Sequence, residues 1–164
     1  MEGTIQGKPV RESAYEYSEL ALPNDSNGLG NVLGGKVMHL VDLAAAIAGL
    51  RHARTPVVTA SVDHLDFLHP VHVGELIMLC ASVNRVFRTS MEIGVKVTTE
   101  KLLNGERVHT CSAYLTFVAI DANGKAIPII PVIPETDEEK RRYRQAGERR
   151  DARLALRRKL KADT

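Results

Sequence analysis

Asp42 is the residue with the clearest potential for chemistry in this sequence. It is the only carboxylate between Lys36 and Leu50, a run in which most side chains are apolar. Burying an unpaired carboxylate costs several kcal/mol, so such a group is either compensated by a structural hydrogen bond or put to use. We favour use over a purely structural role.

Two segments ahead of Asp42 could supply polar partners. Gly34 and Gly35 open the apolar run, and the free N–H groups of a helix start beside two glycines suit a developing oxyanion, although a tight entry turn explains them equally well. The polar loop before them offers four side chains, which turn chemistry alone can explain and among which the spacing does not choose. These are Asn24, Asp25, Asn27 and Asn31.

The remaining polar features carry weaker signals. His39 lies three residues before Asp42 and could form an acid–base pair with it, but we favour a core or interface role. Arg88-Thr89-Ser90 could bind a small anion, and a solvated turn explains it at least as well. Cys80 and Cys111 lie in apolar runs, which predicts small buried side chains, and neither has the spacing of a metal site.

One helix and several strands must position these residues. The segment 34–50 is apolar on every side, which predicts a helix that is buried all round. A strand is predicted over 12–22, and the later strands are joined by short turns, which predict antiparallel neighbours in a four-stranded meander. The later strands are predicted at 57–68, 75–86, 90–103 and 106–120, with an Asn104-Gly105 hairpin between the last two.

These elements predict an α+β fold with one antiparallel sheet beside a long helix. Because one sheet covers only one side of a helix, an apolar surface all round requires a second cover. The simplest cover is another copy of the chain, so we expect at least a dimer. After a Pro- and Ile-rich stretch, Thr136 and Glu139 form a capping box that predicts a helix over 136–161.

Length and charge exclude several classes of protein. The chain has 164 residues, 44% of them hydrophobic, which fits one domain with a core. Its 22 Lys and Arg nearly balance its 20 Asp and Glu, which argues against a nucleic-acid-binding protein. The longest apolar run, Leu43 to Leu50, is far shorter than the ~20 residues that span a bilayer, and no secretory signal is evident. We therefore expect a soluble cytoplasmic protein without membrane association.

Six motifs follow one another along the chain. They are Asn24-Asp25-Ser26-Asn27-Gly28-Leu29-Gly30-Asn31-Val32-Leu33-Gly34-Gly35, Met38-His39-Leu40-Val41-Asp42, Val57-Val58-Thr59-Ala60-Ser61-Val62-Asp63, Phe67-Leu68-His69-Pro70-Val71-His72-Val73-Gly74-Glu75, Arg88-Thr89-Ser90-Met91 and Thr116-Phe117-Val118-Ala119. Over about residues 12–130, this linked set resembles the acyl-coenzyme A thioesterases of the hotdog superfamily, in the cytosolic acyl-CoA hydrolase branch.

The resemblance implies a long helix wrapped by an antiparallel sheet, in dimers that pair edge to edge with active sites at their interface. Many members are trimers of dimers, so a homohexamer is expected. The implied catalytic pair is Asp42 with Asn27 from the opposing subunit, which selects one of the four loop candidates. The implied residues around the thioester and coenzyme A are Gly34, Gly35 with its oxyanion-binding amide, Thr59, Arg88, Thr89 and Ser90.

The function implied is hydrolysis of acyl-CoA to a free acid and coenzyme A, with no metal or other cofactor and with an apolar tunnel for the acyl chain. Two alternatives stay open. A protein of the same fold could sense acyl-CoA without cleaving it, or could be a hydratase or dehydratase that uses His39.

We expect a thioesterase domain over 1–134 and a helical extension over 135–164. The extension carries 11 basic and 7 acidic side chains. We expect its excess of positive charge to meet the phosphates of coenzyme A.

Overall fold

The computed structural model describes residues 6–162 and contains the predicted helices and strands. Two short 3-10 turns, Val10–Glu12 and Pro23–Asp25, were not predicted. The main elements are β1 (Lys8–Pro9), β2 (Tyr15–Leu20), α1 (Gly34–Ala53), β3 (Val57–Phe67), β4 (Leu76–Val86), β5 (Ser90–Lys101), β6 (Glu106–Ala119), β7 (Val132–Ile133) and α2 (Asp137–Ala162).

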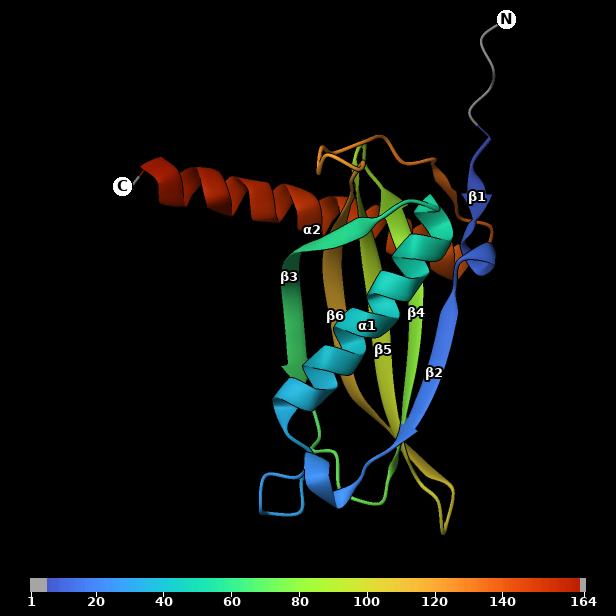
Figure 1. Ribbon diagram of the computed structural model, residues 1–164, viewed down its shortest axis with the longest axis vertical. Helices are drawn as coiled ribbons and strands as arrows, with labels where there is room; N and C mark the ends of the chain where they lie inside the picture. Colours follow the sequence, from blue (N-terminus) through green and yellow to red (C-terminus); the bar gives the residue numbers. More distant parts are fainter. Residues whose placement is uncertain (1–5, 163–164) are drawn as a thin grey trace, which may run out of the picture.

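The main sheet has five antiparallel strands in the order β2-β4-β5-β6-β3. Helix α1 lies across one face of this sheet, and α2 crosses the opposite face near one end of the strands (Figure 1). We call the face that carries α2 the outer face. The expected α+β arrangement of one antiparallel sheet and a long helix is therefore confirmed.

The predicted order of the strands is wrong for β3. Strands β4, β5 and β6 form a meander, but β3 pairs with β6 and forms an edge of the sheet, so β3 and β4 are not neighbours. The eight residues between β3 and β4 can reach ~26 Å when extended, whereas β3 and β4 stand three strand spacings apart, about 14 Å. A short joint therefore does not require adjacent strands.

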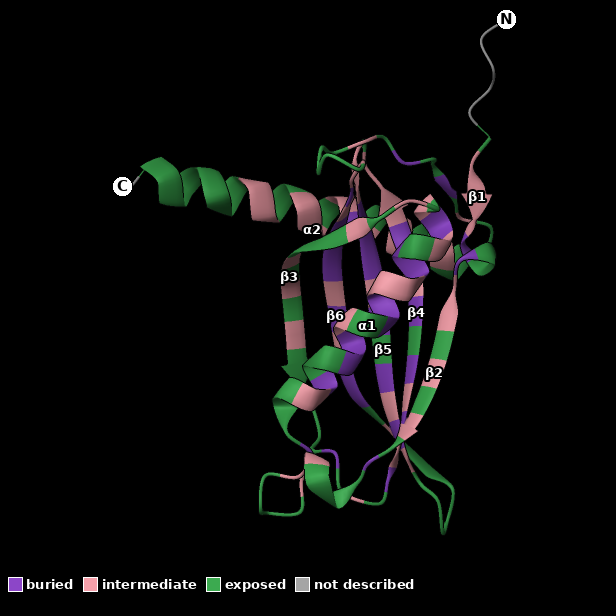
Figure 2. Ribbon diagram, in the orientation of Figure 1, coloured by how far each residue is buried: buried purple, intermediate pink, exposed green. Residues whose placement is uncertain are grey.

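Helix α1 is buried on the side that faces the sheet and exposed on the other side (Figure 2). Exposed fractions of 47% for Met38, 43% for Leu43 and 44% for Leu50 show that its second apolar side lacks a cover in the single chain. The expectation of burial all round is thus met on one side only. The buried side chains of α1 belong to Val37, Leu40, Val41, Ala44, Ala45, Ala48 and His52.

The C-terminal end of α1 is held by a buried histidine. His52 Nε2 lies 2.9 Å from the carbonyl oxygen of Ile130, and its Nδ1 lies 3.5 Å from Ser13 Oγ. Lys8 Nζ donates to the carbonyl oxygens of Arg51 and His52, at 2.8 and 2.9 Å. These bonds tie α1 to the small parallel sheet of β1 and β7. Burial lowers the pKa of His52 from its ordinary value of 6.5.

Helix α2 begins with the predicted capping box, in which the Glu139 N–H donates to Thr136 Oγ1 at 3.1 Å and the Thr136 N–H donates to Glu139 Oε2 at 3.1 Å. The helix is anchored on the outer face by Arg149. The guanidinium donates to both oxygens of Glu92, a carboxylate that is 2% exposed, and stacks 3.7 Å from the centre of the Tyr114 ring. This fixed ion pair joins α2 to β5.

The two cysteines differ from the expected pair of buried side chains. Cys111 is buried, and burial raises the pKa of its thiol to about 11. Cys80 is exposed on the outer face, because its side chain points away from α1. Among the described residues, no helix is both long enough and apolar enough to cross a membrane.

Replacing Arg149 by Met should lower the free energy of unfolding by about 3 kcal/mol, because Glu92 would remain as a buried carboxylate without its cation. Thermal or urea unfolding measures the loss. The matched control is Arg144→Met, since Arg144 is exposed on the same helix. Equal stability of the two variants would contradict the anchoring role of Arg149.

The stability of the fold should decrease as the pH falls below about 6.5. Because burial lowers the pKa of His52 in the folded chain, the unfolded chain takes up the proton first, and acid favours unfolding between pH 6.5 and the lower folded pKa. Urea unfolding at about pH 7.5 and about pH 5.5 measures the effect. His52→Gln should be less stable at the higher pH but lose less stability on acidification. An unchanged pH dependence in this variant would contradict the assignment.

Candidate active site

Asp42 and Thr59 form the polar pair at the centre of the candidate site. Asp42 lies half-buried in α1, and its Oδ1 accepts a hydrogen bond of 2.8 Å from Thr59 Oγ1 on β3. Thr59 stands opposite the buried Phe117 in the β3–β6 pair, and the strand is irregular directly after it. The strand therefore holds the hydroxyl beside α1, with the carboxylate oriented by a charge-assisted bond.

The turn that contains Arg88, Thr89 and Ser90 lies at the same end of the sheet as Thr59. Ser90 pairs with Val118, and Val118 pairs with Val58, the residue before Thr59. Two strand spacings, about 10 Å, separate Ser90 from Val58. The Thr89 carbonyl accepts the amide of Ala119 at 3.1 Å, and the Arg88 side chain is exposed.

Asn27 lies in a closed loop ahead of α1. Its N–H donates to the Asn31 carbonyl at 2.8 Å, and its Oδ1 accepts the amide of Leu29 at 3.0 Å. The loop is fixed to the segment before β4 by two further bonds, from the Val32 amide to the Val71 carbonyl at 2.7 Å and from the Val73 amide to the Gly30 carbonyl at 3.0 Å. Asn27 is therefore held at the end of the molecule where α1 begins (Figure 1).

Gly34 and Gly35 form the exposed first residues of α1. Within the described part of the chain, no backbone carbonyl accepts a hydrogen bond from either amide. A Cβ on Gly35 would meet no atom within 4 Å, so the space in front of this residue is open. These are the free donors expected at a helix start.

The helix separates Gly35 from Asp42. They are seven positions apart in the sequence, which is about 10.5 Å along the helix axis. An oxyanion donor must lie about 3 Å from the oxygen that it stabilises, and the attacking group must reach the adjacent carbon. Within one chain, Gly35 and Asp42 are therefore too far apart to act on one carbonyl.

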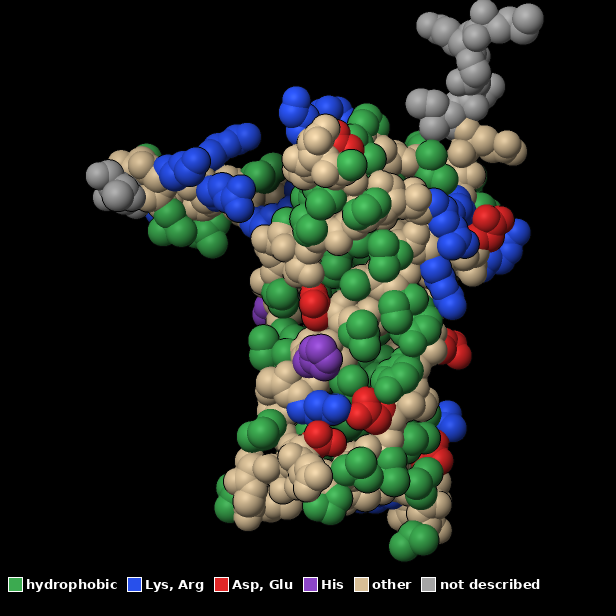
Figure 3. Space-filling model, viewed as in Figure 1, with side chains coloured by type: hydrophobic (Ala, Val, Ile, Leu, Met, Phe, Trp, Pro, Cys, Tyr) green, Lys and Arg blue, Asp and Glu red, His purple; other side chains and the backbone are tan. Residues whose placement is uncertain are grey.

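The predicted site residues thus fall into two groups. The first, with Asp42 and Thr59, lies towards the end of the sheet that carries the 88–90 turn, and the second, with Asn27, Gly34 and Gly35, lies at the start of α1. Figure 3 shows hydrophobic side chains over much of the face that carries α1 and the β3 edge. The exposed ones include Met38, Leu43, Val58, Val62 and Phe67.

Sequence reasoning missed three ion pairs near the second group, two made by Lys36 and one made by His72. Lys36 Nζ lies 2.8 Å from Glu19 Oε1 on β2 and 3.7 Å from Asp25 Oδ1, and its hydrogen bond is the main cause of the lowered pKa of Glu19. His72 Nδ1 lies 2.9 Å from Glu75 Oε1, beside the segment that fixes the loop. Among the quoted motifs, only the one over residues 67–75 pointed to the His72–Glu75 pair. His39 is exposed on α1, which rules out a core role within the single chain.

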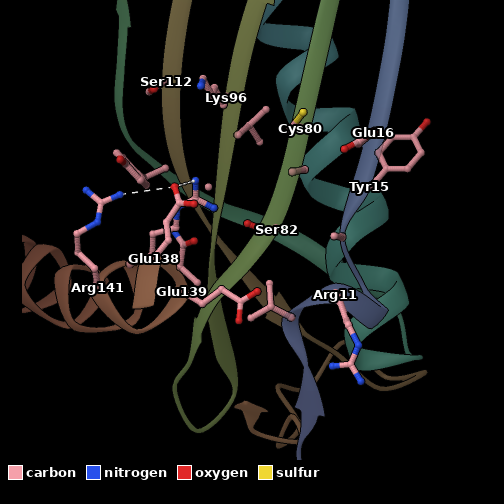
Figure 4. Close-up of a pocket in the computed structure, with 18 of the residues that line it drawn as sticks. Arg11, Tyr15, Glu16, Cys80, Ser82, Lys96, Ser112, Glu138, Glu139 and Arg141 are labelled. Atoms are coloured by element: carbon pink, nitrogen blue, oxygen red, sulfur yellow. Dashed lines mark hydrogen bonds and ion pairs between the residues drawn. The ribbon is translucent and has the colours of Figure 1, made fainter. Parts of the chain in front are cut away.

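A hollow in the surface lies elsewhere. A cavity of about 610 Å³ opens on the outer face, between the first half of α2 and the sheet (Figure 4). The side of the cavity away from α2 is lined by Glu16, Cys80, Lys96 and Ser112. The sheet separates it from Asp42, so it is not the expected acyl tunnel. No cluster of side chains suited to a metal ion occurs within residues 6–162.

Comparison with known proteins identifies the family. Residues 29–105 match the thioesterase superfamily. An uncharacterized acyl-CoA thioester hydrolase of Bacillus subtilis is 40% identical over 83% of this chain and 79% of its own length. A hexameric acyl-CoA thioesterase of known structure is 42% identical, with a TM-score of 0.90 over 92% of this chain and 97% of its own.

A second solved structure, the acyl-CoA hydrolase of Staphylococcus aureus with butyryl coenzyme A and coenzyme A, gives 35% identity and a TM-score of 0.89 over 96% of both chains. The two solved structures match the chain over nearly its whole length and share its central helix and antiparallel sheet. The chain therefore belongs to the thioesterase superfamily, in the hotdog-fold family of acyl-CoA thioester hydrolases.

Proposed function

We propose that this acyl-CoA thioester hydrolase builds each active site from two chains, with Asp42 and Thr59 of one copy facing Asn27 and Gly35 of another. The observation that carries the proposal is the separation of Gly35 from Asp42 by about 10.5 Å of helix. Gly35 and Asp42, which must act on one carbonyl, lie at different positions along the axis of α1. Both positions border the same exposed apolar face.

A dimer through β3 would bring the two groups together. Two copies of one edge strand related by a two-fold axis pair antiparallel, so the second copy is inverted end to end. Inversion moves the α1 start of one chain towards the Thr59 end of the other. The same pairing would cover apolar side chains that are now exposed, including Met38, Leu43 and Val62. Because two solved relatives are hexameric, we further propose a trimer of such dimers.

The carboxylate of Asp42 would carry the reaction. With Oδ1 held by Thr59, Oδ2 is the oxygen left to take a proton from water as that water attacks the thioester carbonyl. Direct attack by the carboxylate, through a mixed anhydride that water then opens, uses the same geometry. The bond from carbon to sulfur breaks, and the products are a free acid and the thiol of coenzyme A.

The second chain would supply the groups that stabilise this reaction. The Gly35 amide, which no backbone carbonyl of the described chain occupies, is aimed outwards as a donor to the oxyanion. Asn27 would orient the attacking water or the carbonyl. The sequence of steps needs no metal or redox group.

The two ends of the substrate would meet different surfaces. The acyl chain would lie along the apolar face between α1 and the second copy. The exposed guanidinium of Arg88, with the hydroxyls of Thr89 and Ser90, suits the phosphates of coenzyme A. We propose the cytoplasm as the site of action, since both cysteines are free thiols.

Release of free thiol from acyl-CoA esters of several chain lengths tests the activity. Asp42→Ala should lose at least about a hundredfold in kcat, because the base or nucleophile is removed, while its thermal unfolding stays close to that of the parent protein. Stoichiometric binding of acyl-CoA without thiol release by the parent protein would favour a sensor instead.

Co-expression of Asp42→Ala and Asn27→Ala chains should restore about a quarter of the parent activity. If each site takes Asp42 from one chain and Asn27 from its neighbour, random assembly gives about one intact site in four. Each variant expressed alone is the control and should be almost inactive. A site contained within one chain would leave the mixture as inactive as its components, which would contradict the shared site.

Thr59→Val should lower kcat about tenfold with little change in KM, since it removes the hydrogen bond to Asp42 but keeps the shape of the side chain. Thr59→Ser, which keeps the hydroxyl, should recover most of the activity. Equal kcat for the Val variant and the parent protein in the thiol-release assay would show that this bond does not orient the carboxylate.

A further inference from the structure

Helix α2 crosses the outer face almost perpendicular to the strands. Tyr143 meets Arg85 of β4, Arg149 meets β5 and β6, and Arg153 forms an ion pair with Asp63 of β3. The ten residues from Tyr143 to Arg153 rise about 15 Å, and the three spacings from β4 to β3 measure about 14 Å. The rise of the helix between these contacts therefore matches the width of the strands that it crosses.

The helix continues past the edge of the sheet. After Arg153, residues 154–162 add about 13 Å, which is nearly three more strand spacings. Figure 1 shows this part of α2 projecting beyond β3, past the last strand of the described sheet. We call residues 154–162 the projecting segment.

The residues on the side of α2 that faces the sheet recur at intervals of three and four positions, and this pattern continues into the projecting segment. Ala146, Arg149 and Arg153 are three and four residues apart, and Leu156 and Leu160 follow at the same intervals. Leu156 is 57% exposed, although it continues a stripe that is buried against the sheet at Ala146. Figure 3 shows hydrophobic side chains along one side of the projecting segment and Lys and Arg along the other.

We propose that the projecting segment docks on the outer face of a second copy of this chain, joined through β3. The inference rests on the dimer of the proposed function and adds a contact to it. If the β3 strands of two copies pair, the two sheets form one continuous sheet. The side of α2 that includes Leu156 would then lie over the outer face of the second copy. Each copy would then extend its α2 across the other, in two equivalent contacts.

Charge supports a second copy as the occupant. The projecting segment carries four cations and no carboxylate. The outer side of β3 carries Asp63 and Asp66, and the Asp66 side chain is 64% exposed, with its ion pair to His64. Cations beside the leucine stripe would therefore lie near carboxylates of the second copy as well as over its strands. The cations are Arg157, Arg158, Lys159 and Lys161.

Dilution of the full-length protein tests the docking contact. In sedimentation or light scattering, Leu156→Glu should raise the concentration at which half of the dimers dissociate by about tenfold or more, because it puts a carboxylate into an apolar contact. Ala155→Glu adds the same charge at an exposed position that points away from the leucine stripe, and it should behave as the parent protein. Equal dissociation of the two variants would overturn the docking contact.

Cross-linking locates the contact independently. A photoreactive benzoylphenylalanine at position 156 should give covalent dimers on a denaturing gel, with the link mapped by mass spectrometry to β3 or β6 of the second copy. The same group at position 155 should give few. Links to any other surface, or none in a protein that is dimeric, would overturn the docking contact and leave the shared site intact. A parent protein that is monomeric but active would overturn both proposals.

Discussion

One sheet can bury only one side of α1, and this limit on burial explains much of the structure. The sequence of α1 is apolar on all sides, and full burial of a side chain such as Leu43 contributes roughly 1.5–3 kcal/mol. The single chain obtains this stabilisation only on the face towards the sheet. It leaves exposed a row of apolar side chains and, next to them, the open edge of β3. An exposed apolar row beside an open strand edge is a surface suited to association.

The rigid geometry of α1 also separates the chemical groups. A helix places residues seven apart about 10.5 Å from one another along its axis, so Gly35 and Asp42 cannot approach one carbonyl from the same chain. The fold brings Thr59 to Asp42 because β3 returns along α1 as an edge strand. It keeps Asn27 with Gly35 because the loop leads directly into the helix. In the proposed dimer, each chain would therefore hold halves of two different sites, and the uncovered face of α1 would be the surface on which halves from two chains meet.

The outer face of the sheet holds a buried charge that needs a partner. Glu92 is a buried carboxylate on a strand, and the hydrogen bonds of Arg149 and Asn84 offset the cost of burying it. We expected the positive charge of the C-terminal extension to meet the phosphates of coenzyme A. Two of its cations, Arg149 and Arg153, instead form ion pairs with carboxylates of the sheet. Their positions also set the direction of α2, which carries its last residues past the β3 edge.

The sequence by itself determined the elements and the nature of the candidate site. The apolar run of α1, the Asn104-Gly105 hairpin between β5 and β6 and the capping box at Thr136 are local patterns, set by interactions within a few residues, and the structure contains all three. The prominence of Asp42 was also visible in the residues, and the family resemblance added Asn27 and Thr59. The spacing that separates Gly35 from Asp42 could be read directly from the sequence, once the helix was assigned.

Only the tertiary structure decided the order of the strands and the contacts across the sheet. Turn length restricts how far apart two strands can lie but does not choose the edge, so β3 was assigned the wrong neighbour. The Arg149–Glu92 pair joins residues 57 positions apart, and no local pattern connects them. Such contacts depend on which surfaces compete for burial when the whole chain packs. The sequence predicted that one side of α1 would lack a cover, but only the packing of the sheet decided which side this is, the one with Met38, Leu43 and Leu50.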